Sequence, residues 1–423
     1  MEEATGVYKE KGAIDWRLGL VYVCGMKFHG VMLAWPLLAA SVAPSLGSSE
    51  DSSPVEPSVL AQQAWQTAAG KYLDDRMDLW FVKANKLQSG EAKTSCVSCH
   101  TGLPYVMARP ALRRALGVSQ PTVQETKLLE ETLRRVETYG SHELLFKDKE
   151  DQSRGTEAVL NLLVLAREET PENRAALSGP MQKAVKEFWK TQRADGAWDW
   201  VDFGLEPYES SDSVYYGAAV AAVAVGSASA YNEGAGERGS VGLDKLRRYL
   251  KANYAGQNLY SKTWMLLAST QMEGLLDRAE MEALAKDLQR RQNEDGGWSL
   301  YKLGPWTWSK ADPPYGPEGR PDRALLSKSD GYATGLIAYA MGEAGLAAGA
   351  PSVRLAQEWL RSNQREWQIA ERRWNCWRSY SLNYDHEHGG ENGEPWRRMF
   401  MSDAATAFAA LALLPRDLRA EYK

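Results

Sequence analysis

Two kinds of apolar pattern alternate along the chain. Segments such as "SVYYGAAVAAVAVG" (213–226) and "GYATGLIAYAM" (331–341) are apolar on nearly every side, which is typical of a helix buried all round. Segments such as "EMEALAKDLQRR" (280–291) carry charges on one side and apolar residues on the other, which is typical of a helix that covers a core. The alternation predicts helical hairpins, each with one inner and one outer helix.

Six such pairs are predicted. Six helical pairs favour a closed ring, because an open one-dimensional stack would not need this particular number of repeats. The expected fold class is therefore all-α, an (α/α)6 toroid of six helical hairpins. Outer helices are expected near 58–73, 122–139, 175–192, 242–252, 277–292 and 351–364, and inner helices near 99–115, 153–167, 211–226, 258–270, 329–344 and 402–414.

A short motif recurs at the end of two outer helices. "QRADGAW" spans Gln192 to Trp198 and "QNEDGGW" spans Gln292 to Trp298, with Gln, Asp, Gly and Trp at the same spacing. A degenerate third copy, "QREW", begins at Gln364. Recurrence at fixed spacing identifies these segments as copies of one structural unit.

The motif resembles the QW repeats of terpenoid cyclases of the squalene-hopene type, and the resemblance covers most of residues 58–415. It implies the toroid that this family shares with protein prenyltransferases, and a structural role for the Gln and Trp residues. The family's chemistry is not implied, because its acidic D-x-D-D sequence is absent and "YLDDRMD" (72–78) lacks the first Asp. The zinc ligands of prenyltransferases have no evident counterpart either.

Residues 93–117 contain a second motif, Cys96, Cys99 and His100. Two thiols on one turn followed by a histidine are what covalent haem c attachment requires, with His100 as the iron ligand. The sequence therefore predicts one covalent haem c, embedded at the rim of the toroid where the first inner helix begins. The alternatives are a pair of buried thiols, a redox-active C-x-x-C, and half of a zinc site.

The loop histidines are candidates for the second axial ligand of the haem iron. His142 precedes the second inner helix, and His386 and His388 precede the sixth, so both loops flank the expected haem position. Met107 is a poor candidate because it lies two turns along the helix that already supplies His100. Solvated loop histidines beside an open iron are the alternative.

The N-terminal segment resembles an export signal. Lys27 precedes the short apolar run 31–43, which is too short to span a bilayer. We expect an export segment at 1–45, a flexible spacer at 46–57, the toroid at 58–415 and a tail at 416–423, with the protein periplasmic or otherwise exported. Cys24 falls in or before the signal, and Cys376 is expected to be a buried packing residue.

Several carboxylates begin or flank the inner helices. Asp212, Asp330 and Asp403 are interpreted as charges that complement helix N-termini. The alternative is a ring of carboxylates at the cavity mouth that acts as acid, base or ligand, which Glu157 would join.

Composition limits the function classes. With 50 basic and 55 acidic residues and no basic block, nucleic acid is not an expected partner. Three functions are considered, in this order. The leading hypothesis is haem binding and electron transfer to a redox partner protein.

The second hypothesis is a haem-dependent oxidoreductase that acts on a small apolar, isoprenoid-like substrate. A carbohydrate-active toroid is the third, because the 16 Trp residues include many in loops, where indole rings stack on sugars.

Overall fold

The computed structural model describes residues 59–84, 87–144, 146–233, 235–306, 323–347, 350–369, 372–383 and 399–419. The chain divides into two units, Met1–Glu56 and Pro57–Lys423. The predicted export segment, the spacer, Cys24, His386 and His388 lie outside the described residues. All of the described residues belong to the second unit.

All six predicted helix pairs are present. The boundaries agree within a few residues except for the first outer helix, which extends ten residues further than expected, and the fourth, which begins six residues earlier. The outer helices are α1 (Val59–Lys83), α3 (Val123–Glu137), α5 (Arg174–Lys190), α8 (Gly236–Asn253), α10 (Arg278–Gln289) and α13 (Pro351–Asn363). The inner helices are α2 (Gly102–Ala115), α4 (Glu150–Glu168), α6 (Ser213–Ser227), α9 (Leu259–Ser269), α12 (Gly331–Glu343) and α14 (Phe400–Leu413).

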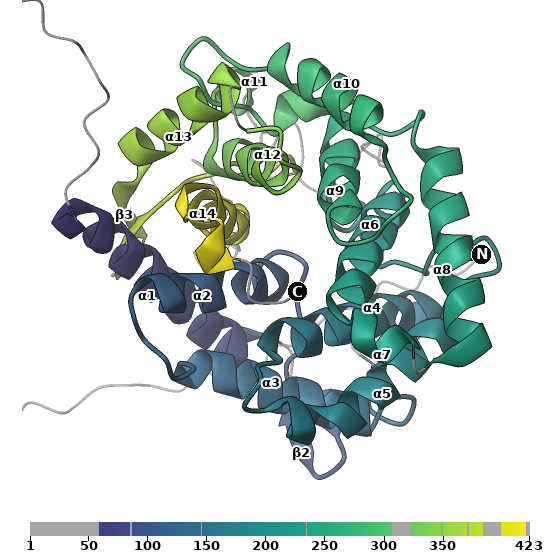
Figure 1. Ribbon diagram of the computed structural model, residues 1–423. Helices are drawn as coiled ribbons and strands as arrows, with labels where there is room; N and C mark the ends of the chain where they lie inside the picture. The colour runs from purple at the N-terminus through teal and green to yellow at the C-terminus, as the bar shows by residue number, and fades with distance from the viewer. Residues whose placement is uncertain are drawn as a thin grey trace, which may run out of the picture. The chain divides into compact units, whose positions relative to one another are not determined.

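The inner helices form a closed ring. Along the chain each inner helix packs against the next, and α14 packs back against α2 (Figure 1). The outer helices surround this ring, and α1 also packs against α14, so the first and last repeats meet. The (α/α)6 toroid is therefore confirmed.

Small residues set the spacing of the inner ring. A Cβ atom on Gly335 of α12 would lie 2.5 Å from the backbone nitrogen of Ala409 in α14. A Cβ atom on Gly217 of α6 would overlap the Trp200 indole. Glycine allows backbones and large rings to approach this closely. The apolar, Ala-rich inner helices are thus packed on all sides, as their sequence pattern predicted.

The repeated Gln and Trp residues fasten each outer helix to its surroundings. Trp198 donates its indole N–H to the carbonyl of Phe188 at 2.9 Å, and Trp298 does the same to Leu288 at 2.7 Å. Gln292 donates to the carbonyl of Ser352 on the next outer helix at 2.8 Å. The indoles therefore satisfy carbonyls in the last turn of an outer helix, where intrahelical partners are missing, and the Gln side chain joins that helix to the next one. The motif is structural.

The third copy of the motif differs from the sequence expectation. Gln364 donates to the carbonyl of Trp65 in α1 at 3.3 Å, so this copy joins the sixth outer helix to the first. The indole that reaches back to the Leu360 carbonyl, at 2.7 Å, belongs to Trp377 and not to Trp367. A hairpin of β3 (Arg365–Ile369) and β4 (Arg372–Cys376) is inserted between the Gln and its Trp.

The remaining elements are short. A second hairpin joins β1 (Leu87–Ser89) to β2 (Ala92–Thr94), around Gly90 with a positive φ of 62°. The structure also has the short helices α7 (Ser229–Glu233) and α11 (Arg323–Leu326) and the 3-10 turns η1 (Lys147–Lys149), η2 (Tyr301–Leu303) and η5 (Asp417–Arg419). Neither hairpin was predicted, because strands of three to five residues leave little periodic signal.

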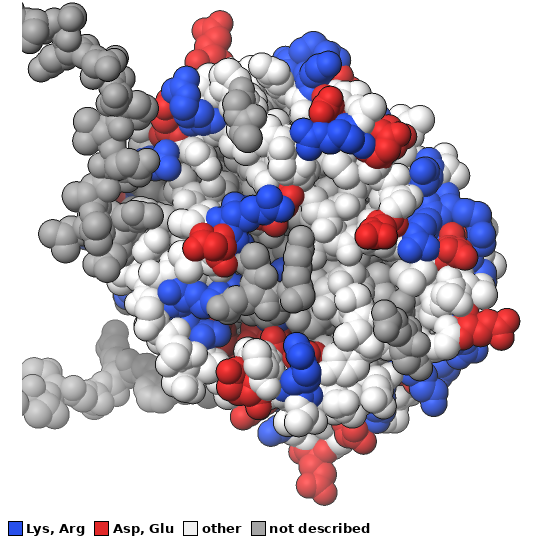
Figure 2. All heavy atoms as spheres, in the orientation of Figure 1, with Lys and Arg blue, Asp and Glu red and all other residues white. Residues whose placement is uncertain are grey.

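Charges on the face shown in Figure 2 are mixed in sign. Basic and acidic side chains alternate around the rim, with uncharged residues between them. This face has no single-sign field of the kind that attracts nucleic acid. Within the described ranges, every helix is too short or too polar to cross a bilayer.

Candidate functional site

The loops that lead into the inner helices gather at one face of the ring, which we call the mouth. These loops carry Cys96, Cys99, His100 and His142. All of them except the five-residue connection 254–258, between α8 and α9, are longer than the connections on the other face. They are also where the sequence pattern placed the candidate chemistry. A functional site is therefore expected at the mouth.

One of these loops, residues 201–210, crosses the mouth, and we call it the strap. The Glu206 N–H donates to the side-chain oxygen of Asn383 at 2.9 Å, and the Asn383 amide donates to the Glu206 carbonyl at 2.6 Å. Glu206 precedes the third inner helix, whereas Asn383 precedes the sixth. Because the third and sixth repeats are opposite in a six-membered ring, the strap spans the opening.

Beneath the strap lies a group of buried aromatic rings, which we call the tyrosine cluster. The rings of Tyr216 and Trp264 are 5.1 Å apart, and those of Tyr208 and Tyr332 are 5.9 Å apart. Every member of the cluster is at most 5% exposed. The members are Tyr208, Tyr216, Tyr260, Trp264, Tyr332 and Phe408.

Some polar atoms of the tyrosine cluster are unsatisfied. The hydroxyls of Tyr260 and Tyr332 lie 3.0 Å apart and share a hydrogen bond. The Tyr208 hydroxyl, the Tyr216 hydroxyl and the Trp264 indole N–H make no hydrogen bond of good geometry among the described residues, although the Tyr332 hydroxyl lies near Tyr208 and Trp264 and the Tyr260 hydroxyl lies near Tyr216. Buried polar groups normally have a partner, so these three suggest a site that a polar ligand or water would complete.

Glu209, on the strap, is the carboxyl group of interest. Its side chain has no hydrogen bond or ion pair within the described part of the chain, and burial raises its pKa to about 7. The negative charge of Glu209 contributes to raising the pKa of Cys96, Cys99 and Tyr216, so these groups lie in one region. A half-buried carboxyl with a pKa near neutrality can donate a proton at physiological pH.

The two cysteines are thiols at neutral pH. Cys99 is buried and Cys96 is half-buried. Burial is the main cause that raises the pKa of Cys96 to about 11, and burial with Glu209 raises the pKa of Cys99 well above its usual value. Because the thiolate is the nucleophilic form, neither cysteine is activated in this state.

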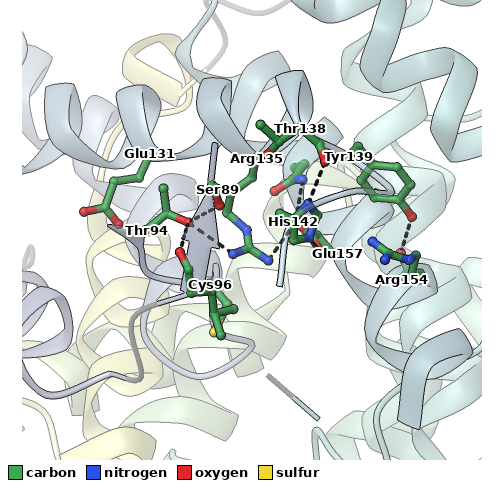
Figure 3. Close-up of polar contacts among 12 residues, drawn as sticks. Ser89, Thr94, Cys96, Glu131, Arg135, Thr138, Tyr139, His142, Arg154 and Glu157 are labelled. Atoms are coloured by element: carbon green, nitrogen blue, oxygen red, sulfur yellow. Dashed lines mark hydrogen bonds and ion pairs between the residues drawn. The ribbon is translucent and has the colours of Figure 1, made fainter. Parts of the chain in front are cut away.

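His142 and Glu157 belong to a buried charged cluster near Cys96 (Figure 3). His142 Nε2 lies 2.7 Å from a Glu157 carboxylate oxygen, and His142 Nδ1 lies 3.2 Å from the Thr138 carbonyl. Arg135 pairs with the other Glu157 oxygen at 2.8 Å. Burial would raise the pKa of Glu157, but Arg135 and then His142 outweigh it and leave the pKa lowered. Both ring nitrogens of His142 are thus engaged.

Asp403 is the centre of a second buried network, at the start of α14. It accepts from Arg76 Nε at 2.6 Å and Nη2 at 3.1 Å, from the Tyr72 hydroxyl at 2.7 Å and from the Thr101 hydroxyl at 2.7 Å. Burial raises the pKa of Asp403, and Arg76 opposes this. The Thr101 hydroxyl lies 2.9 Å from His100 Nδ1, so the network reaches the histidine of the C-x-x-C-H motif.

The interpretation of Asp330 as a helix-terminal charge is confirmed. It caps α12, accepting from the backbone N–H groups of Tyr332 and Ala333, and its other oxygen accepts from the Leu300 N–H. Burial raises the pKa of Asp330 to about 6. Asp212 lies at the N-cap position of α6 without a side-chain cap. A shared ring of free carboxylates is not formed, because Asp330, Asp403 and Glu157 are each committed to internal partners.

Sequence reasoning missed the most suggestive groups at the mouth. Glu209 and Tyr208 lie in a loop with no motif, and nothing in their spacing distinguishes them. Tyr216 and Tyr332 occur in inner helices where an aromatic residue is expected in any case. Cys376, by contrast, is fully buried as expected, and burial raises its pKa to about 12.

Comparison with solved structures finds toroids of another kind. An unsaturated glucuronyl hydrolase from Bacillus sp. GL1, described as responsible for the degradation of glycosaminoglycan, matches with a TM-score of 0.50 and 14% identity. The match covers 86% of this chain and 98% of that chain. A second structure, titled as a UGL variant with dGlcA-Glc-Rha-Glc, matches with a TM-score of 0.48 and 14% identity over 85% and 98%. No family model and no curated protein matches the sequence.

These findings correct two expectations. The assignment to a terpenoid cyclase-like toroid carrying a c-type cytochrome site is wrong, because the solved structure that matches with a TM-score of 0.50 is an unsaturated glucuronyl hydrolase. The description as a cytochrome with an iron-binding, electron-transfer function is wrong for the same reason. In addition, no three or more His, Cys, Asp or Glu residues of the described chain are grouped so as to hold a metal ion.

The corrections have a physical origin. Gln and Trp that close helix ends are useful in any ring of helical hairpins, so the motif reports the architecture and not one family. The assignment of Cys96, Cys99 and His100 as thioether and iron ligands of one haem c is a narrower expectation, and it stays a prediction of the motif.

Proposed function

We propose that the protein is a carbohydrate-active toroid that binds a saccharide at its mouth and acts on it with Glu209 as proton donor. The observation that carries the proposal is the Glu209 carboxyl, without a partner among the described residues and with its pKa raised to about 7 by burial, next to the tyrosine cluster. Export of the protein, expected from the N-terminal sequence, belongs to the same proposal.

The tyrosine cluster supplies the recognition chemistry. Saccharides present flat apolar ring faces and many hydroxyls, and aromatic side chains with polar ends match both features. The Tyr208 and Tyr216 hydroxyls and the Trp264 N–H would gain hydrogen bonds of good geometry, which they do not make within the described residues. Electron transfer and oxidation of an apolar substrate are less well supported, because unsatisfied polar groups favour a polar ligand.

Glu209 supplies the chemical step. A protonated carboxyl donates its proton to the leaving oxygen of a glycosidic bond, and the bond from carbon to that oxygen breaks. Water then adds to the carbon, and the proton that this water loses restores the acid form of Glu209. The similar structure from Bacillus sp. GL1 is named as a hydrolase of unsaturated glucuronyl groups, which supports a saccharide substrate. The strap would hold Glu209 over the substrate through the pairing of Glu206 with Asn383.

The proposal is tested with the purified full chain. We expect release of sugar from at least one member of a panel of glycosaminoglycan-derived unsaturated disaccharides and neutral oligosaccharides. Glu209→Gln, which cannot donate the proton, should lower kcat about 10²- to 10⁴-fold on that substrate. Glu143→Gln, an exposed carboxyl on a neighbouring mouth loop, is the matched control and should leave kcat unchanged. Equal activity of Glu209→Gln and the unmodified chain would remove Glu209 from the reaction.

A further inference from the structure

His100 stands in an environment that fixes where its ring proton lies. Its Nδ1 is 2.9 Å from the Thr101 hydroxyl oxygen. That hydroxyl has a single proton, which it donates to Asp403 at 2.7 Å. The Thr101 oxygen is therefore left as an acceptor toward His100, so Nδ1 must carry the proton of the neutral imidazole.

Asp403 makes this arrangement rigid. Its two oxygens accept from Arg76 twice, from Tyr72 and from Thr101, which fills the four acceptor positions of a carboxylate. No position remains from which Asp403 could donate a proton back to Thr101. The direction of the chain from His100 through Thr101 to Asp403 is thus set by the ion pair with Arg76, whose side chain is 1% exposed.

The orientation of the His100 ring is fixed as well. The ring stacks on Phe400 with centroids 3.6 Å apart and planes inclined by 18°, and it meets Trp80 edge-on at 5.2 Å. Nε2 has no hydrogen bond to any described residue, and His100 is half-buried at the mouth. The Nε2 lone pair is therefore not used by any described residue of the chain.

We infer that His100 is held with its proton on Nδ1 and that its Nε2 lone pair is the acceptor that the mouth offers to a hydroxyl of the bound saccharide. The ligand part of this inference rests on the proposed function; the tautomer does not. Thr101 and Asp403 are positioning residues, since they act through His100. The tyrosine hydroxyls and the Trp264 N–H donate to the sugar, whereas His100 accepts from it, so the site recognises hydroxyl groups in both directions.

The tautomer is read directly by long-range proton-nitrogen NMR on the full chain labelled with ¹⁵N-histidine, at neutral pH. We expect the unprotonated signature at Nε2 and the protonated one at Nδ1 of His100, assigned by its loss in His100→Gln. Thr101→Val should abolish this preference, and Thr101→Ser, which keeps the hydroxyl, should retain it. A proton on Nε2 in the unmodified chain would overturn the inference, as would a Soret band showing Nε2 bound to haem iron.

The ligand part is tested by calorimetric titration of the saccharide that the activity panel identifies. Thr101→Val should raise Kd about tenfold, as expected for one lost hydrogen bond, while Thr101→Ser should not change it. His100→Gln keeps an acceptor near the Nε2 position and should bind better than His100→Ala, which covers the case that Thr101→Val fails to fold. Equal affinity for all variants would overturn the acceptor role but leave the proposed function intact. If no saccharide binds the unmodified chain, the proposed function and the ligand part both fail, and the NMR result alone decides the tautomer.

Discussion

Two carboxyl groups at the mouth, Asp403 and Glu209, are used differently by the fold. Asp403 accepts four hydrogen bonds and pairs with Arg76, whereas Glu209 has no partner within the described residues. Both stand at the mouth, in loops or helix starts of equivalent kind. The difference teaches that burial alone does not mark a functional carboxylate. What separates the two is whether the protein has already used the acceptor positions that a ligand would need.

Glu168 extends the comparison to the opposite face of the ring. It ends α4, is 5% exposed, and one of its carboxylate oxygens has no hydrogen-bond partner among the described residues. Burial and then Glu125 raise its pKa to about 8, against Arg113 and Arg114. Glu168 thus resembles Glu209 in its unmet hydrogen bonding while lying far from the strap in the fold.

Removing the partner of Asp403 should have the largest effect. Arg76→Met leaves a buried carboxylate without its counter-charge, which typically costs about 3 to 5 kcal/mol of unfolding free energy. Urea denaturation followed by circular dichroism measures the change. The double variant Arg76→Met, Asp403→Asn is the control and should recover part of the loss. A single variant within about 0.5 kcal/mol of the unmodified chain would mean that the pair does not stabilise the fold.

Neutralising Glu168 should have an intermediate and opposite effect. Its folded pKa of about 8 lies above the unfolded value, so the folded state holds a proton that the unfolded state releases, and stability falls as pH rises from about 4 to 8. Glu168→Gln removes this cost and should stabilise the protein by about 1 to 3 kcal/mol at pH 7, and not at pH 4. Thermal unfolding at both pH values tests this. The exposed Glu130→Gln serves as control, and a gain that is equal at the two pH values would show that the raised pKa of Glu168 is not its cause.

Glu209→Gln should have the smallest effect on stability. The sign is the same as for Glu168, because the folded pKa of about 7 is also raised, and the cost develops as pH rises from about 4 to 7. Glu209 is half-buried, so solvent screening should keep the gain below about 1 kcal/mol at pH 8. Together with the large loss of kcat expected for the same variant, this result would separate a chemical role from a structural one. If Glu209→Gln destabilised the protein, Glu209 would have a structural role like that of Asp403, with partners inside the fold.

The sequence was sufficient for the architecture because the ring is built from periodic signals. Helices that are apolar on every side, such as α6 and α12, can only be inner helices, and the Gln and Trp spacing identifies their connections. The register of the third motif was not predictable. Because of the inserted hairpin, the indole that donates to the end of the outer helix belongs to Trp377 and not to Trp367. A short insertion with no strong pattern is enough to break a fixed spacing.

The site was harder to predict because its contacts are distant in sequence. Arg76 and Asp403 are 327 positions apart, and Glu206 and Asn383 are 177 apart. No local pattern reports such pairs. Cys96, Cys99 and His100 were conspicuous because they are adjacent, and that adjacency gave the haem motif more weight than the scattered tyrosines and Glu209, which the folded ring brings together.

The bond from Gln364 to the Trp65 carbonyl also affects how the ring unfolds. An open array of repeats exposes two terminal units, which fray first and require polar caps. In this ring the sixth hairpin is fastened to the first, so every hairpin has two neighbours and none is terminal. Loss of order should therefore be cooperative around the whole circle. The same closure makes the position of the chain ends arbitrary, and a circular permutant that starts at another repeat should reach the same fold.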